Sequence, residues 1–152
     1  MTAILIDTNL LVYAHDRSEF AKQGRAIEIL GHLQATGSGR LSAQCLAEFF
    51  SVVIRGPTPR LTVAEASLQV ARLARVWPVV DVTPQIVLEA TRGVREHQFS
   101  FWDAQIWAAA RLNQIPVVFS EDFSDGSVLE GVRFVNPFAE DFHIEEWFGG
   151  HA

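Results

Sequence analysis

The chain has 152 residues, of which 49% are hydrophobic and 20% are charged, and this balance indicates one folded domain over residues 1–152 rather than a disordered segment. Its single cysteine, Cys45, excludes both a disulfide within the chain and a cysteine-rich zinc site. No stretch has the order of a signal peptide, and no apolar run is long enough to cross a membrane, so we expect a cytoplasmic protein.

The net charge of −6 is unusual for a protein that handles nucleic acid, but the charge is unevenly distributed. From Glu121 onward there are eight acidic residues and one basic residue, whereas residues 1–120 hold ten acidic and eleven basic residues. The basic residues are eleven arginines and one lysine, Lys22. Arginine suits phosphate contacts, but this bias alone does not decide between function classes.

Apolar periodicity and turn residues predict strands that alternate with helices, which is the pattern of a three-layer α/β fold with a small, mostly parallel sheet. Three aliphatic residues at 4–6 predict a buried strand, after which Thr8 or Asn9 caps a helix over 10–14. The elements that follow are a helix over 18–36 capped by Ser18, a strand over 40–42, a helix over 43–55, a helix over 62–77 that opens with a capping box, a strand over 79–82, helices over 84–98 and 101–113, a strand over 116–120 and an edge strand over 132–135.

Asp7 stands between the predicted strand over 4–6 and the helix that follows it. In open α/β sheets this is the crevice in which ligands bind. A carboxylate at this point also fits a simple helix cap or a strand-end charge. Its position makes Asp7 a candidate for the site, and the other acidic residues decide between these interpretations.

Glu48 lies in the predicted helix over 43–55, whose other residues are mostly apolar. At helical spacing Glu48 shares one face with Gln44, Ser51 and Arg55. This face is either the solvent side of an amphipathic helix, with Arg55 supporting Glu48, or a narrow polar stripe that lines a cleft. The helix alone favours neither interpretation.

Asp103 stands in the segment FWDAQIWAAA, which is apolar almost all round. An unpaired carboxylate in such a helix costs several kcal/mol, and the nearby helix N-terminus offsets only about 0.3–1 kcal/mol of that cost. We therefore expect a partner for Asp103, either a bound cation or, as the structural alternative, an arginine in a buried ion pair.

Three acidic residues, Glu121, Asp122 and Asp125, follow the predicted strand over 116–120. Because side chains alternate along a strand, Asp122 continues the face of Ser120 while Glu121 points to the other side. Asp125 precedes a glycine in a turn-like context, where aspartate commonly bonds the nearby backbone. Asp122 is therefore the candidate for the site, although Glu121 and Asp125 remain possible contributors.

The four candidate carboxylates, Asp7, Glu48, Asp103 and Asp122, would repel one another at one edge of a sheet unless a divalent cation lay among them. Oxygen ligands without cysteine clusters or paired histidines point to Mg²⁺ or Mn²⁺. Such an ion lowers the pKa of a bound water and neutralises charge on a phosphoryl transition state.

Two other classes also place aspartates at strand ends, namely phosphatases of the HAD type and response-regulator receivers. The first need a D-x-D motif, whereas Asp7 is followed two positions on by Asn9. Both use a lysine in the site, and Lys22, the one lysine, lies within a predicted helix. Both classes are therefore disfavoured.

Four segments, in this order and spacing, resemble the motifs of PIN-domain ribonucleases: ILIDTN, the glutamate within AQCLAEFF, FWDAQIWAAA and VVFSEDFSDG. The chain is most similar to the VapC toxins of VapBC toxin–antitoxin systems, from Ile4 to the NPF at 136–138. Carried over residue by residue, the acidic quartet of the family falls on Asp7, Glu48, Asp103 and Asp122, and polar positions that assist the site fall on Thr8, Asn9 and Ser120.

The resemblance implies a PIN-like fold, Mg²⁺-dependent endonucleolytic cleavage of RNA, a homodimer, and inhibition by a small antitoxin whose helix binds an apolar groove. Two alternatives stay open: a PIN nuclease that acts in RNA processing without an antitoxin, and a catalytically silent PIN-like module that acts only by binding protein. The quartet argues against the silent module, because protein binding gives no reason to gather four repelling charges. The overall acidity departs from what RNA binding favours and leaves the affinity of this chain for RNA open.

Overall fold

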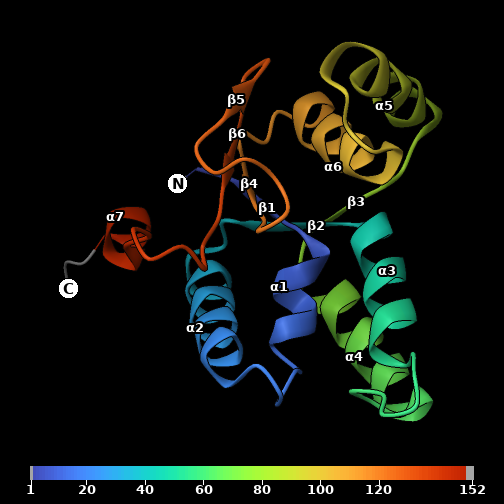
Figure 1. Cartoon of the computed structure of the whole chain (residues 1–152), viewed down its shortest axis with the longest axis vertical. Coiled ribbons are helices and arrows are strands. Elements are labelled where there is room, and N and C mark those ends of the chain that lie inside the picture. Colours follow the sequence, from blue (N-terminus) through green and yellow to red (C-terminus); the bar gives the residue numbers. More distant parts are fainter. Residues whose placement is uncertain (1, 150–152) are drawn as a thin grey trace.

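The computed structural model describes residues 2–149, in which six strands and seven helices are assigned (Figure 1). The strands are β1 Ile4–Ile6, β2 Gly39–Ser42, β3 Val79–Val80, β4 Val117–Phe119, β5 Val128–Leu129 and β6 Val132–Val135. The helices are α1 Thr8–Tyr13, α2 Phe20–Thr36, α3 Ala43–Val53, α4 Val63–Val76, α5 Pro84–His97, α6 Phe101–Leu112 and α7 Ile144–Phe148.

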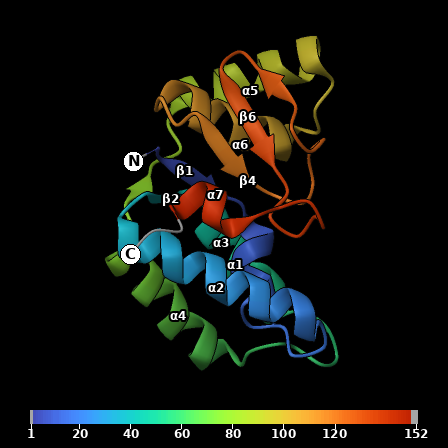
Figure 2. The same cartoon turned by 90° about the vertical axis from the view of Figure 1, so that its left-hand side faces the viewer.

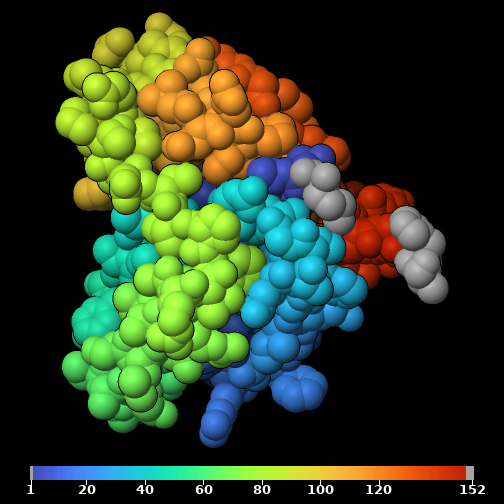
Figure 3. Space-filling view, turned by 180° about the vertical axis from the view of Figure 1, so that it is seen from behind, coloured from blue at the N-terminus to red at the C-terminus, as the bar shows by residue number. Residues whose placement is uncertain are grey.

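The strands form one sheet in the order β3-β2-β1-β4-β6-β5, with every pair parallel except β5 and β6. Helices α5 and α6 lie on one side of the sheet and α1 to α4 on the other, as two perpendicular views show (Figures 1 and 2). On the side opposite to that of Figure 1, α2 and α4 cover most of the lower half of the surface (Figure 3). The predicted three-layer fold with a small, mostly parallel sheet is confirmed.

The central strand pair sets the position of the site. The three residues of β1 lie opposite the three residues of β4, with Ile6 paired to Phe119, and all six are buried. The backbone N–H of Asp7 donates to the carbonyl of Phe119 at 3.0 Å. The next residues on the two strands, Asp7 and Ser120, are therefore neighbours although 113 positions separate them.

Local signals in the sequence account for several element ends. The side chain of Thr62 accepts from the Glu65 backbone while Glu65 caps in return, so the predicted capping box is present at the start of α4. Pro84 begins α5, as expected for a residue without an N–H. Gly37 ends α2 with a φ of 68°, a left-handed conformation that glycine adopts without strain.

Close packing against the sheet requires a second glycine. A Cβ atom on Gly39, in β2, would lie 2.4 Å from the indole of Trp77, which follows α4. Trp77 is 8% exposed, so its ring has little room to move away. Gly39 thus lets the end of α4 pack directly on the sheet beside the two central strands.

Two predicted helix caps are wrong. Asp7, rather than Thr8 or Asn9, is the N-cap of α1, and its carboxylate accepts from the Thr8 backbone. Ser18 does not cap α2, which begins two residues later after Glu19. Both the N–H and the hydroxyl of Ser18 donate instead to the carboxylate of Asp16, because that buried acid turns the chain between the two helices.

The edge of the sheet also differs from the prediction. The strand over 132–135 is present as β6, but it is not the edge, because β5 pairs with it in antiparallel orientation. Helix α3 ends at Val53, two residues before the predicted end, and β3 keeps only the first two residues of the predicted strand over 79–82. The other predicted elements match to within two residues at each end.

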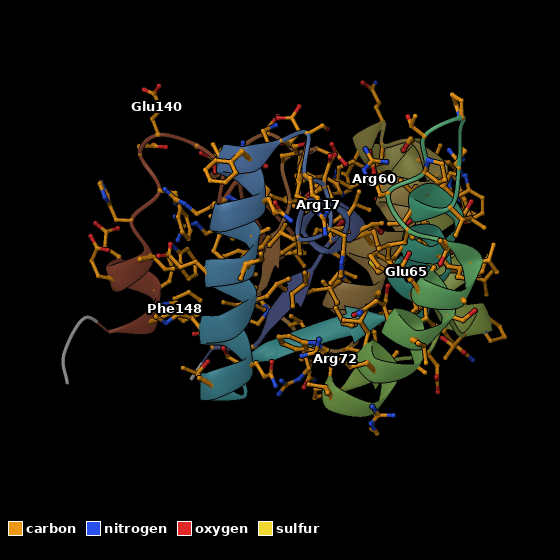
Figure 4. All side chains as sticks on the ribbon, turned by 90° about the horizontal axis from the view of Figure 1, so that it is seen from below. Arg17, Arg60, Glu65, Arg72, Glu140 and Phe148 are labelled. Atoms are coloured by element: carbon orange, nitrogen blue, oxygen red, sulfur yellow. The ribbon has the colours of Figure 1, made fainter. Side chains whose placement is uncertain are left out.

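The aromatic and acidic tail forms α7 and packs on α2 from outside (Figure 4). Phe148 stacks on His32 of α2, with ring centroids 5.1 Å apart. Trp147 and Phe142 both contact the ring of Phe119, the last residue of β4. Among the described residues, no helix has the length and apolar character needed to cross a membrane.

Candidate active site

Asp7 lies at the carboxyl end of β1 and is 5% exposed. Its Oδ1 accepts from the backbone N–H of Thr8 at 2.7 Å, and its Oδ2 accepts from the hydroxyl of Ser120 at 2.7 Å. Burial nevertheless raises the pKa of Asp7 to about 7, and the negative charges of Asp122 and Glu48 add to the rise. The fold therefore holds a carboxylate in a fixed orientation at a place where its negative charge is costly.

Glu48 faces Asp7 from α3. Its Oε1 accepts from the hydroxyl of Thr8 at 3.0 Å and from the side-chain amide of Gln44 at 3.2 Å. Arg55 lies beyond the end of the helix and donates to Ser51 instead, so the alternative in which Arg55 supports Glu48 is not formed. Glu48 is half-buried and belongs to a polar stripe that lines a cleft.

A sulfur atom completes this corner of the site. The Sγ of Cys45 lies with a carboxylate oxygen of Asp7 and one of Glu48 in a group whose ligand atoms are all within 4.8 Å of one another. Burial raises the pKa of the Cys45 thiol to about 12, so the thiol is neutral at physiological pH. Cys45 was not among the predicted site residues, although its place one helical turn before Glu48 could have indicated that its thiol lies beside the Glu48 carboxylate.

Asp103 enters the site from the first turn of α6, where the hydroxyl of Ser100 caps its backbone N–H. No arginine of residues 2–149 forms an ion pair with Asp103, so the expected alternative of a buried arginine partner is wrong. Burial raises its pKa, and the charge of Asp122 contributes to that rise. The buried part of the helix runs from Ala104 to Ala110, whereas Trp102 is 60% exposed, so Asp103 lies at the boundary between core and solvent.

The hydroxyl of Ser120 organises the β4 side of the site. It donates to Asp7 and accepts from the Asn9 side-chain amide at 3.2 Å and from the backbone N–H of Asp122 at 3.0 Å. Asn9 also donates to the exposed carboxylate of Asp122 at 3.1 Å. The Oδ1 atom of Asn9 is buried and accepts no hydrogen bond from a described residue.

The two other acids after β4 have different partners. Glu121 accepts from the Lys22 ammonium at 2.9 Å and from the hydroxyl of Tyr13. Asp125 accepts from the backbone N–H of Asn136 at 2.8 Å and so closes the loop onto the end of β6. Both point away from Asp7, as the alternation of side chains predicts for Glu121.

The structure brings the predicted site residues together to different degrees. Asp7 and Glu48 are in contact range, Asp122 is tied to Asp7 through Ser120, and Thr8 and Asn9 link these acids. Asp103 approaches from α6 and lies outside the 4.8 Å group, but close enough for the negative charge of Asp122 to help raise the pKa of Asp103. Oxygen ligands of this kind, gathered without a neutralising base, fit a hard divalent cation.

The comparisons with known proteins agree with this geometry. The model of the PIN domain family matches residues 4–124. The structure is similar to that of Mycobacterium tuberculosis VapC20, a sarcin–ricin loop cleaving toxin, at 26% identity with a TM-score of 0.63 over 86% of this chain and 99% of that chain. No curated protein matches the sequence.

Two further structures show the same fold. A toxin–antitoxin complex from Klebsiella pneumoniae is similar at 17% identity, with a TM-score of 0.64 over 90% of this chain and 98% of that chain. DNA-bound VapBC from Salmonella typhimurium is similar at 15% identity, with a TM-score of 0.64 over 88% and 97%. The predicted resemblance in motif and fold is confirmed, and this chain belongs to the PIN domain family.

Proposed function

We propose that this chain is a Mg²⁺-dependent endoribonuclease and the toxin of a type II toxin–antitoxin pair. The observation that carries this proposal is the buried carboxylate of Asp7, which lies in contact range of Glu48 while no arginine or lysine of residues 2–149 neutralises the pair. A protein that gathers acids in this way at the end of its central strands gains from a divalent cation at that point.

In this proposal the cation is held by Asp7, Glu48, Asp103 and Asp122, with Mn²⁺ as a possible substitute. When bound, the cation supplies charge neutralisation for the phosphodiester and a water of lowered pKa. The chain itself orients the ligands: Ser120 and the Thr8 backbone fix Asp7, the Thr8 hydroxyl and Gln44 fix Glu48, and the Asn9 amide fixes Asp122. Thr8, Asn9 and Ser120 are therefore positioning residues.

The proposed partners are an RNA substrate, a small antitoxin protein and a second copy of this chain. Support for the antitoxin comes from the similar structures, several of which are toxin–antitoxin complexes. Light scattering at tens of micromolar tests the homodimer, and a monomeric mass would contradict it. We further propose that residues 1–152 form a single PIN-like domain that acts in the cytoplasm.

Cleavage of single-stranded RNA with and without Mg²⁺ tests the proposed activity. We expect the wild-type protein to cut only with Mg²⁺ or Mn²⁺, and Asp7→Asn to lower the rate by about a hundredfold or more, a loss of roughly 2.7 kcal/mol of transition-state stabilisation. Glu28→Gln, which neutralises an exposed carboxylate in the middle of α2, is the matched control and should cut normally. Full activity in EDTA would contradict the metal-dependent mechanism.

A further inference from the structure

An apolar groove of about 420 Å³ opens beside the carboxylates, between α3 and the start of α6. Ala43, Ala47 and Val82 line it together with the indole of Trp102. Trp102 is 60% exposed, whereas the other tryptophan of α6, Trp107, is fully buried. A large aromatic side chain is therefore presented to solvent at the rim of the site.

The groove and the carboxylate site share a wall. Glu48, a member of the site, also lines the groove. Its partner Gln44 donates both to the Glu48 carboxylate and to the backbone carbonyl of Trp102, at 3.2 and 3.1 Å. One amide thus links an acid of the site to the backbone of Trp102, which carries the exposed indole and directly precedes the acid Asp103 in α6.

The floor of the groove offers one polar contact. Gln105 is 5% exposed, and its side-chain N–H donates to the amide oxygen of Gln44 at 2.8 Å. No hydrogen bond from residues 2–149 reaches the Oε1 atom of Gln105. A ligand that presents an N–H edge to this floor would therefore find an acceptor.

The charge and shape of the groove select the class of ligand. Glu48 is the one charged residue among those that line it, so a phosphate or an acidic side chain would be repelled. An uncharged planar ring with N–H groups on its edge fits both the indole face and the amide floor. A nucleobase has these properties, and aromatic side chains commonly bind unpaired bases by stacking.

We propose that this groove binds an unpaired base of the RNA, stacked on the indole of Trp102, next to the phosphodiester that is cut. The inference rests on the proposed ribonuclease function and adds to it a positioning role for Trp102. A base held there places its own phosphate over the carboxylates, because Glu48 belongs to both surfaces. The site would then prefer flexible single strands, in which a base is free to leave the stack.

A substrate–variant cycle tests this role. The probe is a single-stranded oligoribonucleotide that the wild-type protein cuts at one position, together with a series in which one nucleotide near the cut lacks its base. We expect Trp102→Ala to raise KM about tenfold, within the range for loss of one stacked base, and Trp102→Phe to recover part of that loss. Removal of the base at one position should cost the wild type about tenfold and cost Trp102→Ala nothing more.

The control is Phe20→Ala, which removes an aromatic ring that is 85% exposed at the start of α2, outside the groove. This variant should cut every substrate as the wild type does. Thermal melting of each variant confirms folding, and quenching of tryptophan fluorescence by a nucleoside in EDTA gives a readout that does not depend on cleavage, because a nucleoside has no phosphate for the metal-free carboxylates to repel. We expect this quenching in the wild type and its loss in Trp102→Phe.

The outcomes separate the two proposals. The stacking role is overturned if Trp102→Ala cuts RNA with the wild-type KM. It is also overturned if the losses from Trp102→Ala and from removal of a base add up at every substrate position. In either case a protein partner is the remaining occupant of the groove. If the wild-type protein cuts no RNA with Mg²⁺, the proposed function itself fails. A tenfold loss that is confined to one abasic position supports both.

Discussion

Two acidic clusters in this molecule have almost the same composition and opposite electrostatics. Around Asp7, two carboxylates and a thiol gather within 4.8 Å, and around Glu130, two carboxylates and an imidazole do the same. In the second cluster Arg92 donates to Glu130 at 2.9 Å and to Glu96 at 2.6 Å. In the cluster around Asp7, no arginine or lysine of the described residues donates to either carboxylate.

The pKa values of the two clusters move in opposite directions. Hydrogen bonds from Arg92 and His97 lower the pKa of Glu130 to about 2, so its charge stabilises the fold. Burial raises the pKa of Asp7 to about 7, so its charge opposes folding. Acidic residues in proximity therefore do not by themselves indicate a metal site. The cluster at Asp7 is distinguished by the lack of a neighbouring arginine or lysine among the described residues.

The largest effect on stability is expected in the second cluster, where the guanidinium of Arg92 neutralises the carboxylates. Arg92→Gln leaves Glu89, Glu96 and Glu130 without their shared partner, and we expect a loss of about 2 kcal/mol in the free energy of unfolding. Because the folded-state pKa of Glu130 lies below its ordinary value of 4.5, the difference should shrink as the pH falls from 4.5 toward 2. Urea unfolding at several pH values measures it.

Arg95→Gln is the matched control for this change, because Arg95 is exposed on the same helix and forms no ion pair with a described residue. Its stability should stay within about 0.5 kcal/mol of the wild type. Equal losses in the two variants would contradict the structural role of the Arg92 cluster.

A smaller effect distinguishes the acids that follow β4. We expect Asp122→Asn to lower Mg²⁺-dependent cleavage at least tenfold, about 1.4 kcal/mol of transition-state stabilisation, without loss of folding. Glu121→Gln and Asp125→Asn should stay within a few-fold of the wild type, because these acids bind Lys22 and the backbone instead. An inactive Asp125→Asn beside an active Asp122→Asn would show that the site assignment after this strand is wrong.

The smallest expected effect is a gain in stability. Asp7 ionises in the unfolded chain near its ordinary pKa of 3.8 but in the folded protein near 7, so its charge costs stability from about pH 4 upward and fully above pH 7. In EDTA we therefore expect Asp7→Asn to gain stability relative to the wild type as the pH rises from 4 to 8, to be about 1 kcal/mol more stable at pH 8, and to be less stable at pH 3.5, where Asp7 is uncharged in the folded wild type. The gain stays small because the new amide must share the Ser120 hydroxyl, which already accepts twice.

A lower stability of Asp7→Asn than of wild type at pH 8 in EDTA would show that the Asp7 charge contributes to folding. In that case the contrast between the two clusters would no longer hold.

Much of the fold and the site position follow from short-range patterns. The run of aliphatic residues at 4–6 and the polar residue after it predict a buried strand that ends at Asp7, and the order of the four motifs predicts the PIN fold. The sequence pattern does not predict strand β5 or helix α7, because they have only two and five residues and none of these is fully buried. Their positions depend on packing against β6 and α2.

The contacts that define the site could not be read from local patterns. The hydrogen bond between Ser120 and Asp7 depends on the register of two parallel strands, and the approach of Cys45 depends on where α3 starts after Ser42. The arginine partners considered as alternatives for Glu48 and Asp103 are absent among residues 2–149. Sequence spacing alone does not reveal which charged residues a fold keeps apart.

Titration of Mg²⁺ into metal-free protein, followed by thermal melting at pH 7.5, is the sharpest test of whether the acids around Asp7 bind a cation. We expect the melting temperature of the wild type to rise with Mg²⁺, by an amount that corresponds to about 2.7 kcal/mol at a hundred times the Kd, and that of Asp7→Asn to rise little. Arg92→Gln should keep the full Mg²⁺-dependent rise, because its cluster lies outside the site. An equal rise in wild type and Asp7→Asn, or no rise in the wild type up to tens of millimolar Mg²⁺, would show that these acids do not form a cation site.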